Sequence, residues 1–489
     1  MTHKMIRPAL LALLATAALG GCSLAPPYAR PSVPLAPQWK TADGWQPANP
    51  SDGAPRGDWW TGFGDATLND LVTRADAHNQ TIAQAAATYR QAHALTREAK
   101  AALFPTISAT GAVSHSASGG SRTIVTNGVT SSAGTRSSTS YSVSVDGSWQ
   151  PDLFGKVLNT VSNAHATEQA RQADLASAQL AIDGELATDY LGLRSADAQI
   201  ASLTATVTAY QRSLTIASNR YNAGIVAHTD VFQGQSQLAS AQSDLESEKR
   251  TRAQLEDAIA VLVGENAASF SLPAVANWMP TVPDVPVAVP STLLERRPDI
   301  ASAERQVAAA NAQIGVDRAA FFPVLSLSGS GGFNNDSLSG LFSSAASLWS
   351  IGASLAQTIF DGGARSARVR ADRAAYDAAV ANYRQVTLAA FQNVQDNLAA
   401  TAILARQDAL LRQASVAADR SEASVRFQYQ SGIVVYTDVV TAQATALAAR
   451  RALIQIQADR QTTAVALVQA LGGGWQASDL TSATAPGHP

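Results

Sequence analysis

The residues of this sequence whose side chains could do chemistry recur in matched pairs. One set surrounds Gly224 in "RYNAGIVAHTDVFQGQSQ", and the other surrounds Gly432 in "QYQSGIVVYTDVVTAQAT", 208 residues later. Tyrosine hydroxyls and carboxylates form hydrogen bonds and charge pairs with neighbouring helices or chains. The chemistry indicated is therefore reversible contact, not bond breaking. The matched side chains are Tyr221 and Tyr429, Thr229 and Thr437, and Asp230 and Asp438.

Residues that could support catalysis or metal binding are scattered. Neither a phosphate-binding loop nor a nucleophile triad can be assembled, and the histidines show no metal-ligand spacing. The formal net charge of −3 and the pI of about 6.2 argue against a nucleic-acid surface. No enzymatic activity, metal or cofactor is expected, and His228 is interpreted as an exposed turn residue. The histidines are His3, His78, His93, His115, His165, His228 and His488.

The first 22 residues predict the compartment. Lys4 and Arg7 precede an apolar run at residues 9–19, which is too short to span a bilayer as a helix. Cys22, the only cysteine, follows two glycines and resembles the lipid-attachment site of a bacterial lipoprotein. The alternative is an ordinary secretory signal with a chance cysteine. By resemblance to lipoprotein sorting rules, Ser23 favours the outer membrane.

Two long tracts without proline predict long helices, between Pro151 and Pro273 and between Pro323 and Pro486. Apolar residues repeat every seven positions in both tracts, which indicates coiled-coil packing. Helices of about 65 residues would be roughly 100 Å long, too long for a compact domain. The rows are Leu186, Leu193, Ile200, Val207 and Leu214; Leu175, Ile182, Ala196, Leu203, Tyr210 and Ala217; and, in the second tract, Leu404, Leu411, Ala418 and Val425.

Four short segments predict membrane-spanning β-strands. They begin at Pro105, Tyr141, Pro323 and Ser347, and each has about ten residues that alternate in polarity. The Ser-, Thr- and Gly-rich residues 114–140 are expected to form a surface loop at a hairpin tip. Four strands cannot close a barrel, and an open sheet edge cannot exist in lipid. The sequence therefore predicts a barrel of about twelve strands shared by three chains.

The predicted fold is a mixed α/β membrane protein with an internal two-fold repeat. Each repeat carries a β-hairpin and a long helical hairpin that turns at its glycine, and in a trimer the barrel continues into a helical barrel. The predicted ranges are a signal peptide at 1–21, a lipidated extended tether at 22–57, repeat 1 at 58–272, a Pro-rich linker at 273–290, repeat 2 at 291–474 and a flexible tail at 475–489; the β-hairpins are at about 105–152 and 323–360, and the helical hairpins at about 156–264 and 363–472.

Longer strings resemble the outer-membrane factor (TolC-like) family of efflux channels, in its NodT-type lipoprotein branch. They are "DWWTGFGDATLNDLV" at 58–72, "WQPDLFGK" at 149–156, "LLERRPDIASAERQVAAANAQIGVDRAAFFP" at 293–323 and "IFDGG" at 359–363. The resemblance covers essentially the whole mature chain. It implies a homotrimeric passive duct across the outer membrane and periplasm. Its implied partners are outer-membrane lipid, a periplasmic adaptor (membrane fusion protein) and an inner-membrane RND transporter.

Two other functions remain as alternatives. A specific uptake porin would not need the long helices. The outer-membrane duct of a type I, ABC-driven secretion system would share the fold, although Cys22 and residues 293–323 favour an RND system. The exported substrate cannot be inferred, because selection is expected in the pump.

The resemblance gives the two turns a role at the periplasmic end of the duct. In a trimer each side chain forms a ring of three, and carboxylate rings gate cations in pores. Thr441 occupies a position where relatives often carry an aspartate, so Asp438 with Asp230 is the nearest replacement. The alternative is that both aspartates are helix N-caps. The predicted gate or adaptor-docking residues are Tyr221, Gly224, Thr229, Asp230, Tyr429, Gly432, Thr437 and Asp438, with Arg212, Arg220 and Arg426 as candidate partners.

Overall fold

The computed structural model describes residues 23–34, 39, 57–118, 122–126, 129–133, 136–283 and 296–475. Cys22, the signal peptide, residues 284–290 of the predicted linker and residues 476–489 of the predicted tail lie outside the described residues. The chain divides into two compact units, to which both predicted repeats contribute. The first unit consists of residues 1–30, 91–168 and 305–380, and the second of residues 31–90, 169–304 and 381–489.

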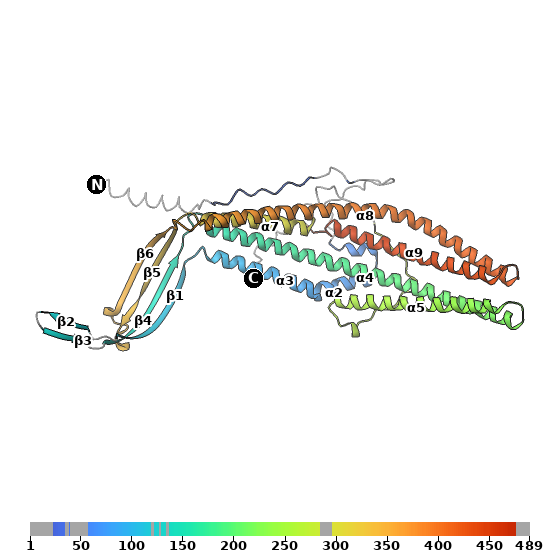
Figure 1. Ribbon diagram of the computed structural model, residues 1–489, viewed down its shortest axis with the longest axis horizontal. Helices are drawn as coiled ribbons and strands as arrows, with labels where there is room; N and C mark the ends of the chain where they lie inside the picture. Colours follow the sequence, from blue (N-terminus) through green and yellow to red (C-terminus); the bar gives the residue numbers. More distant parts are fainter. Residues whose placement is uncertain are drawn as a thin grey trace. The chain divides into compact units, whose positions relative to one another are not determined.

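The first unit contains a four-stranded antiparallel sheet in the order β1-β4-β5-β6 (Figure 1). The four segments predicted as strands therefore form one sheet, in which β4 pairs with β5 and so joins the two hairpins. The strands are β1 (Thr106–Ser118), β4 (Arg136–Trp149), β5 (Val324–Asn335) and β6 (Ser347–Ala356).

The prediction of a surface loop at residues 114–140 is wrong. The β1–β4 ladder runs on to the pair Ser118 and Arg136, and the strands β2 (Arg122–Thr126) and β3 (Val129–Ala133) pair with each other between them. Ladder hydrogen bonds join backbone groups, and threonine is a good strand former. Polar composition therefore did not prevent this segment from continuing the strands.

The register of the sheet separates apolar from polar side chains. Directly paired residues share a face, and successive residues of a strand alternate between faces. Adjacent rows across the four strands therefore line opposite faces. One row is Ala109, Val145, Gly331 and Trp349, and the next is Ser108, Asp146, Ser330 and Ser350.

Residues 23–26 are bound to the parts of two helices, α4 (Lys156–Asn222) and α7 (Pro298–Ala319), that belong to the first unit. Ser23 Oγ donates to Asn159 Oδ1 at 2.8 Å, and Arg318 donates to the carbonyl of Leu24 at 3.2 Å. Gly315 is required here, because a Cβ at that position would lie 2.7 Å from the Cβ of Ala25. The described start of the predicted tether is thus extended but fixed to the fold.

The second unit is helical. The two longest helices of the chain, α4 and α8 (Ala364–Gln430), have 67 residues each, close to the predicted length, and they begin in the first unit. Each is followed by a helix of 35 residues, α5 (His228–Leu262) or α9 (Tyr436–Ala470). No helix in the described part of the chain is both long and apolar enough to cross a membrane. The remaining helices are η1 (Trp59–Phe63), α2 (Ala66–His78), α3 (Gln80–Ala101), η2 (Ala267–Ser269), η4 (Leu338–Gly340) and η5 (Ser344–Ala346).

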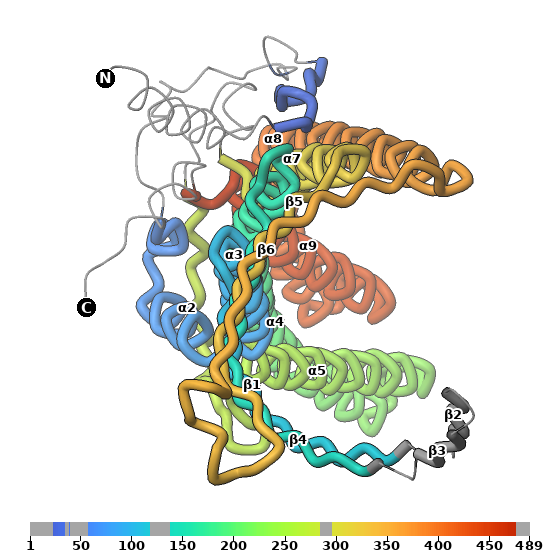
Figure 2. Tube along the Cα trace, turned by 90° about the vertical axis from the view of Figure 1, so that its left-hand side faces the viewer, coloured from blue at the N-terminus to red at the C-terminus, as the bar shows by residue number. Residues whose placement is uncertain are grey.

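Within the second unit α9 contacts both neighbouring long helices. It is joined to α5 by Arg451 and Asp244 (3.3 Å) and to α8 by Arg450 and Glu422 (2.8 Å). Figure 2 shows α9 between α5 and α8 accordingly. One side of α8 is therefore turned away from α9 and α5.

The heptad rows are largely buried in α4 but not in α8. Leu186, Leu193, Leu203 and Tyr210 are buried as predicted, whereas Leu175, Ile200, Val207 and Leu214 are half-buried. The row predicted in α8, from Leu404 to Val425, is only half-buried. The buried row of α8 begins four residues later and is largely polar. Its members are Asp408, Ser415, Glu422 and Tyr429.

Charge pairing explains why this polar row can be buried. Asp408 accepts from Arg460 of α9 at 2.9 Å and from Arg412 at 3.0 Å. Glu422 accepts from Arg450 of α9 at 2.8 Å. Buried charges are tolerated when they are paired and hydrogen-bonded. The α8–α9 seam therefore keeps the heptad spacing with ion pairs in place of apolar side chains.

Candidate functional site at the hairpin tips

The two long helical hairpins turn with the same backbone geometry. Gly224 and Gly432 have φ angles of 72° and 75°, a left-handed conformation that favours glycine. Each turn is closed by a hydrogen bond of 2.9 Å, from Ile225 N to the carbonyl of Arg220 or from Ile433 N to the carbonyl of Gln428. This pattern is a helix C-terminal glycine motif. The repeat seen in the sequence is therefore preserved in the backbone.

The interpretation of the aspartates as N-caps is wrong. The N-cap residues of α5 and α9 are Ala227 and Val435, and neither uses a side chain to cap. Asp230 and Asp438 are the third residues of their helices, in the first turn. A negative charge there interacts favourably with the helix dipole. Both carboxylates therefore remain available for contacts beyond their own helix termini.

Two tyrosines form the core of the second tip. The rings of Tyr429 and Tyr436 lie 5.4 Å apart, and both are buried together with Ala217 of the first hairpin and Val439. A Cβ on Gly234 of α5 would lie 2.9 Å from the hydroxyl of Tyr436, so a glycine is needed for this close packing. The tip of the second hairpin is therefore packed against the first hairpin of the same chain.

Arg220 joins the two tips. Its guanidinium lies 4.7 Å from the centre of the Tyr429 ring, and its Nη1 donates to the Tyr429 carbonyl at 2.8 Å. A second link runs from the hydroxyl of Thr437 to Gln233 Oε1 at 3.3 Å. Of the three candidate arginines, Arg220 is thus the one placed on a predicted site residue within the described chain. Arg426 lies in the wall of a separate cavity of about 390 Å³, with Tyr210 and Glu422.

The electrostatics keep the buried tyrosines neutral. Burial raises the pKa of the Tyr436 hydroxyl to about 12, with further contributions from Tyr429 and the negative charge of Asp230. Burial also raises the pKa of Tyr429, and the positive charge of Arg220 opposes this. The charge of Asp230 thus acts on both tyrosines, while the contacts across the two tips join Arg220 to Tyr429 and Gln233 to Thr437. Asp438 is exposed.

Tyr221 makes different contacts from its repeat counterpart Tyr429. Its ring stacks on His228 with a centroid distance of 4.5 Å and an interplanar angle of 18°. His228 in turn lies 4.2 Å from the ring of Phe232. We call Tyr221, His228 and Phe232 the aromatic stack. His228 is exposed, as predicted, but it is the first residue of α5 and has ring neighbours on two sides.

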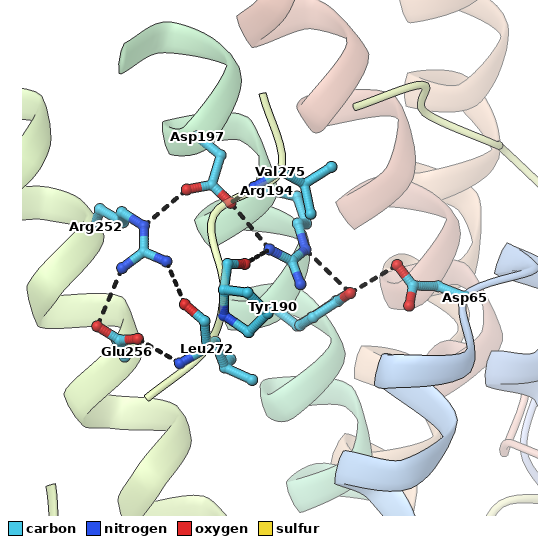
Figure 3. Close-up of polar contacts among 9 residues, drawn as sticks. Asp65, Tyr190, Arg194, Asp197, Arg252, Glu256, Leu272 and Val275 are labelled. Atoms are coloured by element: carbon cyan, nitrogen blue, oxygen red, sulfur yellow. Dashed lines mark hydrogen bonds and ion pairs between the residues drawn. The ribbon is translucent and has the colours of Figure 1, made fainter. Parts of the chain in front are cut away.

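A buried polar network in the second unit was not predicted (Figure 3). The hydroxyl of Tyr190 donates to Asp65 at 2.6 Å and accepts from Arg194 at 3.0 Å. Arg194 also donates to Asp197 at 2.9 Å, and Arg252 of α5 donates to the other oxygen of Asp197 at 2.7 Å. Asp65 additionally caps α2. The network therefore ties α2, α4 and α5 together.

The same network holds the chain that leaves α5. Arg252 donates to the carbonyl of Leu272 at 2.7 Å, while Glu256 accepts from the Leu272 backbone N–H at 2.6 Å. Asp197 accepts from Val275 N at 3.0 Å. Residues 272–275 have no ladder of their own, and these side chains satisfy their backbone groups. The only sequence signal was the helical spacing of Tyr190, Arg194 and Asp197, which the apolar heptad rows obscured.

The family described as "Outer membrane efflux protein" matches residues 71–265 and 289–473. The chain belongs to this outer membrane efflux protein family. Each matched stretch contains one helical hairpin and its tip. The two sets of tip residues therefore lie in two separate stretches that match the same family model.

Individual relatives agree with this assignment. The chain is 32% identical over 468 residues to "Outer membrane protein OprJ" of Pseudomonas aeruginosa, covering 95% of each chain. It is 32% identical over 479 residues to "Solvent efflux pump outer membrane protein SrpC" of Pseudomonas putida, covering 96% of this chain and 98% of the relative. The solved structure of "the outer-membrane channel OprN" matches with a TM-score of 0.84 and 28% identity over 93% of this chain and 100% of that chain.

These likenesses confirm the family resemblance, the mixed α/β fold class with its internal repeat, and the role as an efflux channel of the outer membrane. The chain is accordingly an outer-membrane protein with a periplasmic extension. The members of this family are channel proteins.

Proposed function

We propose that three copies of this chain form the passive exit duct of a tripartite efflux system driven by an inner-membrane RND pump. A periplasmic adaptor would join the duct to the pump. Molecules would enter at the periplasmic end and leave through the outer membrane without chemical change. The structure supports a duct because its conspicuous features are a two-faced sheet and two matched hairpin tips.

The observation that carries the proposal is the four-stranded sheet of the first unit. Its outer strands, β1 and β6, each pair on one side only within the described residues. Trp349 and Ile351 of β6 are 79% and 83% exposed. In lipid an unpaired strand edge is not viable, so β6 of one copy must pair with β1 of another. Three copies of four strands give about twelve strands, enough to surround a lumen lined by the serine face.

The second part of the proposal is a gate at the hairpin tips. Arg220 and the buried Tyr429 hold the two tips of one chain together, and the negative charge of Asp230 acts on the same tyrosine. Three-fold symmetry would repeat this contact three times around the periplasmic end. The contact is polar and local, so an adaptor that engages the tips could release it. We assign closure to these residues and opening to the adaptor.

A covalent lipid on Cys22 is the third part. Residues 23–26 are fixed on α4 and α7 by Asn159, Arg318 and Asn311, which donates to the carbonyl of Pro26 at 2.8 Å. An anchored residue 22 would therefore keep its lipid beside these helices. Mass spectrometry of the mature N-terminus tests this: wild-type protein should start at an acylated Cys22, and Cys22→Ser should lose the modification. An unmodified N-terminus elsewhere in wild-type protein would refute the anchor.

The expected cargo is small and apolar to amphipathic. SrpC, to which this chain is similar throughout, is named for a solvent efflux pump. Solvents and drugs of this kind would be selected by the pump, because the serine-lined sheet face offers no specific binding geometry.

Reconstitution and efflux assays together test the duct. Native mass spectrometry in detergent should give a trimer, and deletion of the gene should increase cellular accumulation of a fluorescent efflux dye. Re-expression should restore efflux only when the adaptor is present. A stable monomer, or efflux that does not depend on an adaptor, would refute the proposal. If an ABC exporter is encoded beside this gene in place of an RND pump, the duct would instead be assigned to type I protein secretion.

A further inference from the structure

We infer that the basic helix ends next to the four-stranded sheet bind anionic phospholipid headgroups in the periplasmic leaflet of the outer membrane. The inference rests on the membrane-spanning sheet of the family and is independent of the proposed pump, adaptor and gate. We call these side chains the basic collar. Its members are Arg97, Lys100, Lys156, Arg318, Arg365, Arg368 and Arg370.

The collar lies where the sheet of the first unit continues into helices (Figure 1). At this end of the sheet each strand is joined to a helix by a short segment: α3 to β1, β4 to α4, α7 to β5 and β6 to α8. In these four helices the seven residues nearest the sheet include seven Lys or Arg and two Asp or Glu. The whole chain instead has 35 Lys or Arg and 38 Asp or Glu. Positive charge is therefore concentrated within about 9 Å of these helix ends.

The charge follows the position of the helix ends and not the direction of the helices. Lys100 and Arg318 lie in the last turns of α3 and α7, where the helix dipole favours a positive charge. At the starts of α4 and α8 the dipole disfavours it. These helices nevertheless carry Lys156 and Arg365 in their first turns, and neither has an acidic residue there. The same local rule is broken at both helix starts, which indicates a function for the charge.

Three collar arginines have partners within the chain. Arg365 Nε donates to Asp361 Oδ2 at 2.6 Å, and Arg368 Nε lies 3.4 Å from Asp317 Oδ1. Arg318 donates to a backbone carbonyl at 3.2 Å. These contacts also occupy two of the carboxylates closest to the collar. They hold the helix ends in place but leave fewer negative groups to neutralise the remaining charges.

The other four collar side chains are exposed. Within the described part of the chain, the side chains of Arg97, Lys100 and Lys156 form neither a hydrogen bond nor an ion pair. Arg97 and Lys100 are three residues apart and therefore share a face of α3. Arg370 donates to Ser366 Oγ at 3.5 Å. Because the Cα–Cβ bonds of a helix tilt toward its N-terminus, the side chains of α8 lean back toward the sheet. These four cations are available to a ligand at the sheet end.

Aromatic side chains next to the collar identify the ligand. Phe104 and Phe360 lie in two of the connecting segments and are 69% and 88% exposed, and Trp149 ends β4. Aromatic side chains of this kind gather at the boundary between hydrocarbon and water. Phosphate groups are strong acceptors for ammonium and guanidinium groups, and basic residues beside a membrane attract anionic lipids. Since the helices extend into the periplasm, the matching headgroups are those of the periplasmic leaflet.

A lipid titration tests the collar. Purified protein in a neutral detergent is titrated with phosphatidylglycerol or with phosphatidylcholine of the same acyl chains, and bound lipids are counted by native mass spectrometry. Wild-type protein should bind phosphatidylglycerol more tightly. The triple variant Arg97→Gln, Lys156→Gln and Arg370→Gln should lose this preference by about fivefold for each charge removed.

The matched control removes one lysine and two arginines elsewhere. It carries Lys249→Gln, Arg250→Gln and Arg420→Gln, all at exposed positions. Lys249 and Arg250 lie within α5, which adjoins no strand, and Arg420 lies about 80 Å along α8 from its start. The control should therefore keep the wild-type preference for phosphatidylglycerol.

The single variant Lys156→Gln separates lipid binding from a structural role. Its charge opposes the dipole of α4, so the thermal midpoint in neutral detergent should not fall. Added phosphatidylglycerol should raise the wild-type midpoint more than that of the variant. A lower midpoint of the variant without lipid, and an equal rise with lipid, would show that Lys156 supports the fold and does not bind headgroups.

Two further results would overturn the inference. The first is equal binding of the two lipids by wild-type protein, or an unchanged preference in the triple variant. The second is an altered ratio of anion to cation permeability in the triple variant with unchanged lipid binding, which would assign the charges to the lumen of the duct. A monomer by native mass spectrometry would refute only the proposed assembly, because each chain carries its own collar.

Discussion

Arg220 of the first helical hairpin covers the ring of Tyr429 of the second, with its guanidinium 4.7 Å from the ring centre and a hydrogen bond of 2.8 Å to the Tyr429 carbonyl. The arginine thus contacts the face of the ring and the backbone, and neither contact needs the tyrosine hydroxyl. This detail separates the possible substitutions at the tip. It predicts which of them loosen the two hairpins and which leave them joined.

Replacing the arginine should open the channel more than replacing the tyrosine by phenylalanine. A cation–π contact and a charged hydrogen bond together contribute about 2–4 kcal/mol per chain. Losing them in Arg220→Ala should shift the closed-to-open equilibrium by roughly tenfold or more. Tyr429→Phe keeps both contacts and is the matched control. Single-channel conductance in planar bilayers measures the effect, and equal conductance of the two variants would contradict the assignment.

The buried network should be essential for stability. Asp197 accepts from Arg194, Arg252 and Val275 N, and its side chain is almost fully buried. Removing one member of a buried pair leaves uncompensated charge and costs about 3–5 kcal/mol. Asp197→Ala should therefore lower the thermal midpoint of helical circular dichroism strongly. Glu246→Gln breaks an exposed pair with Lys249 and should change stability by at most about 1 kcal/mol. Comparable midpoints for the two variants would refute the role of the network.

Asp183 should make the second unit less stable as pH rises. Burial raises the pKa of this carboxyl to about 8, and the negative charge of Asp76 adds to the shift. An unfolded aspartate titrates near a pKa of about 3.9. The folded chain therefore holds a proton that the unfolded chain has lost. This contribution is complete below about pH 4 and disappears as pH rises through about 8.

Asp183→Asn cannot lose this proton, so it isolates the effect. Its thermal midpoint should fall less between pH 5 and pH 8 than the wild-type midpoint does. Asp257→Asn makes the same substitution at an exposed position of α5 and serves as the control. Parallel pH curves for wild type and Asp183→Asn would show that the buried carboxyl is not the titrating group.

Two glycines with similar backbone angles should respond very differently to alanine. Gly432 has a φ of 75° and open space around it, so Gly432→Ala should cost only the left-handed strain of about 1–2 kcal/mol. Gly472 has a φ of 91°, and a Cβ there would lie 2.0 Å from the carbonyl oxygen of Arg296. Gly472→Ala should add about 1–3 kcal/mol or more of overpacking. The yield of folded trimer compares them, and equal yields would contradict the close approach.

The order of helices and strands could be predicted because it depends on patterns along the sequence, such as proline-free tracts and alternating polarity. Proline-free tracts predicted helices of about 65 residues, and α4 and α8 have 67 residues each. Alternation predicted the four strands of the sheet. These signals are local, so they need no knowledge of neighbouring elements.

The remaining features depend on contacts between residues far apart in the sequence, and local sequence patterns do not reveal such contacts. The row of Asp408, Ser415 and Glu422 was overlooked because burial was expected only of apolar residues, and the arginines that pair with it lie about 30–50 residues away on α9. The N-cap assignment failed because both helices begin three residues earlier than N-caps at the aspartates would require. Arg220 was one candidate among three until its distance from Tyr429 was known.

The ion pairs between α8 and α9 determine how the second hairpin responds to salt in the surrounding solution. Toward the tip the α4–α5 seam contains Tyr210, Leu238 and Ala241, and its ion pair of Asp197 with Arg252 lies farther from the tip, whereas α8 and α9 are joined through Asp408, Glu422 and their arginines. Parting the first pair of helices would expose hydrocarbon, and parting the second would hydrate ions that water accepts readily. Dissolved salt strengthens the former seam and weakens the latter. Near the tips, the two hairpins should therefore respond to ionic strength in opposite directions.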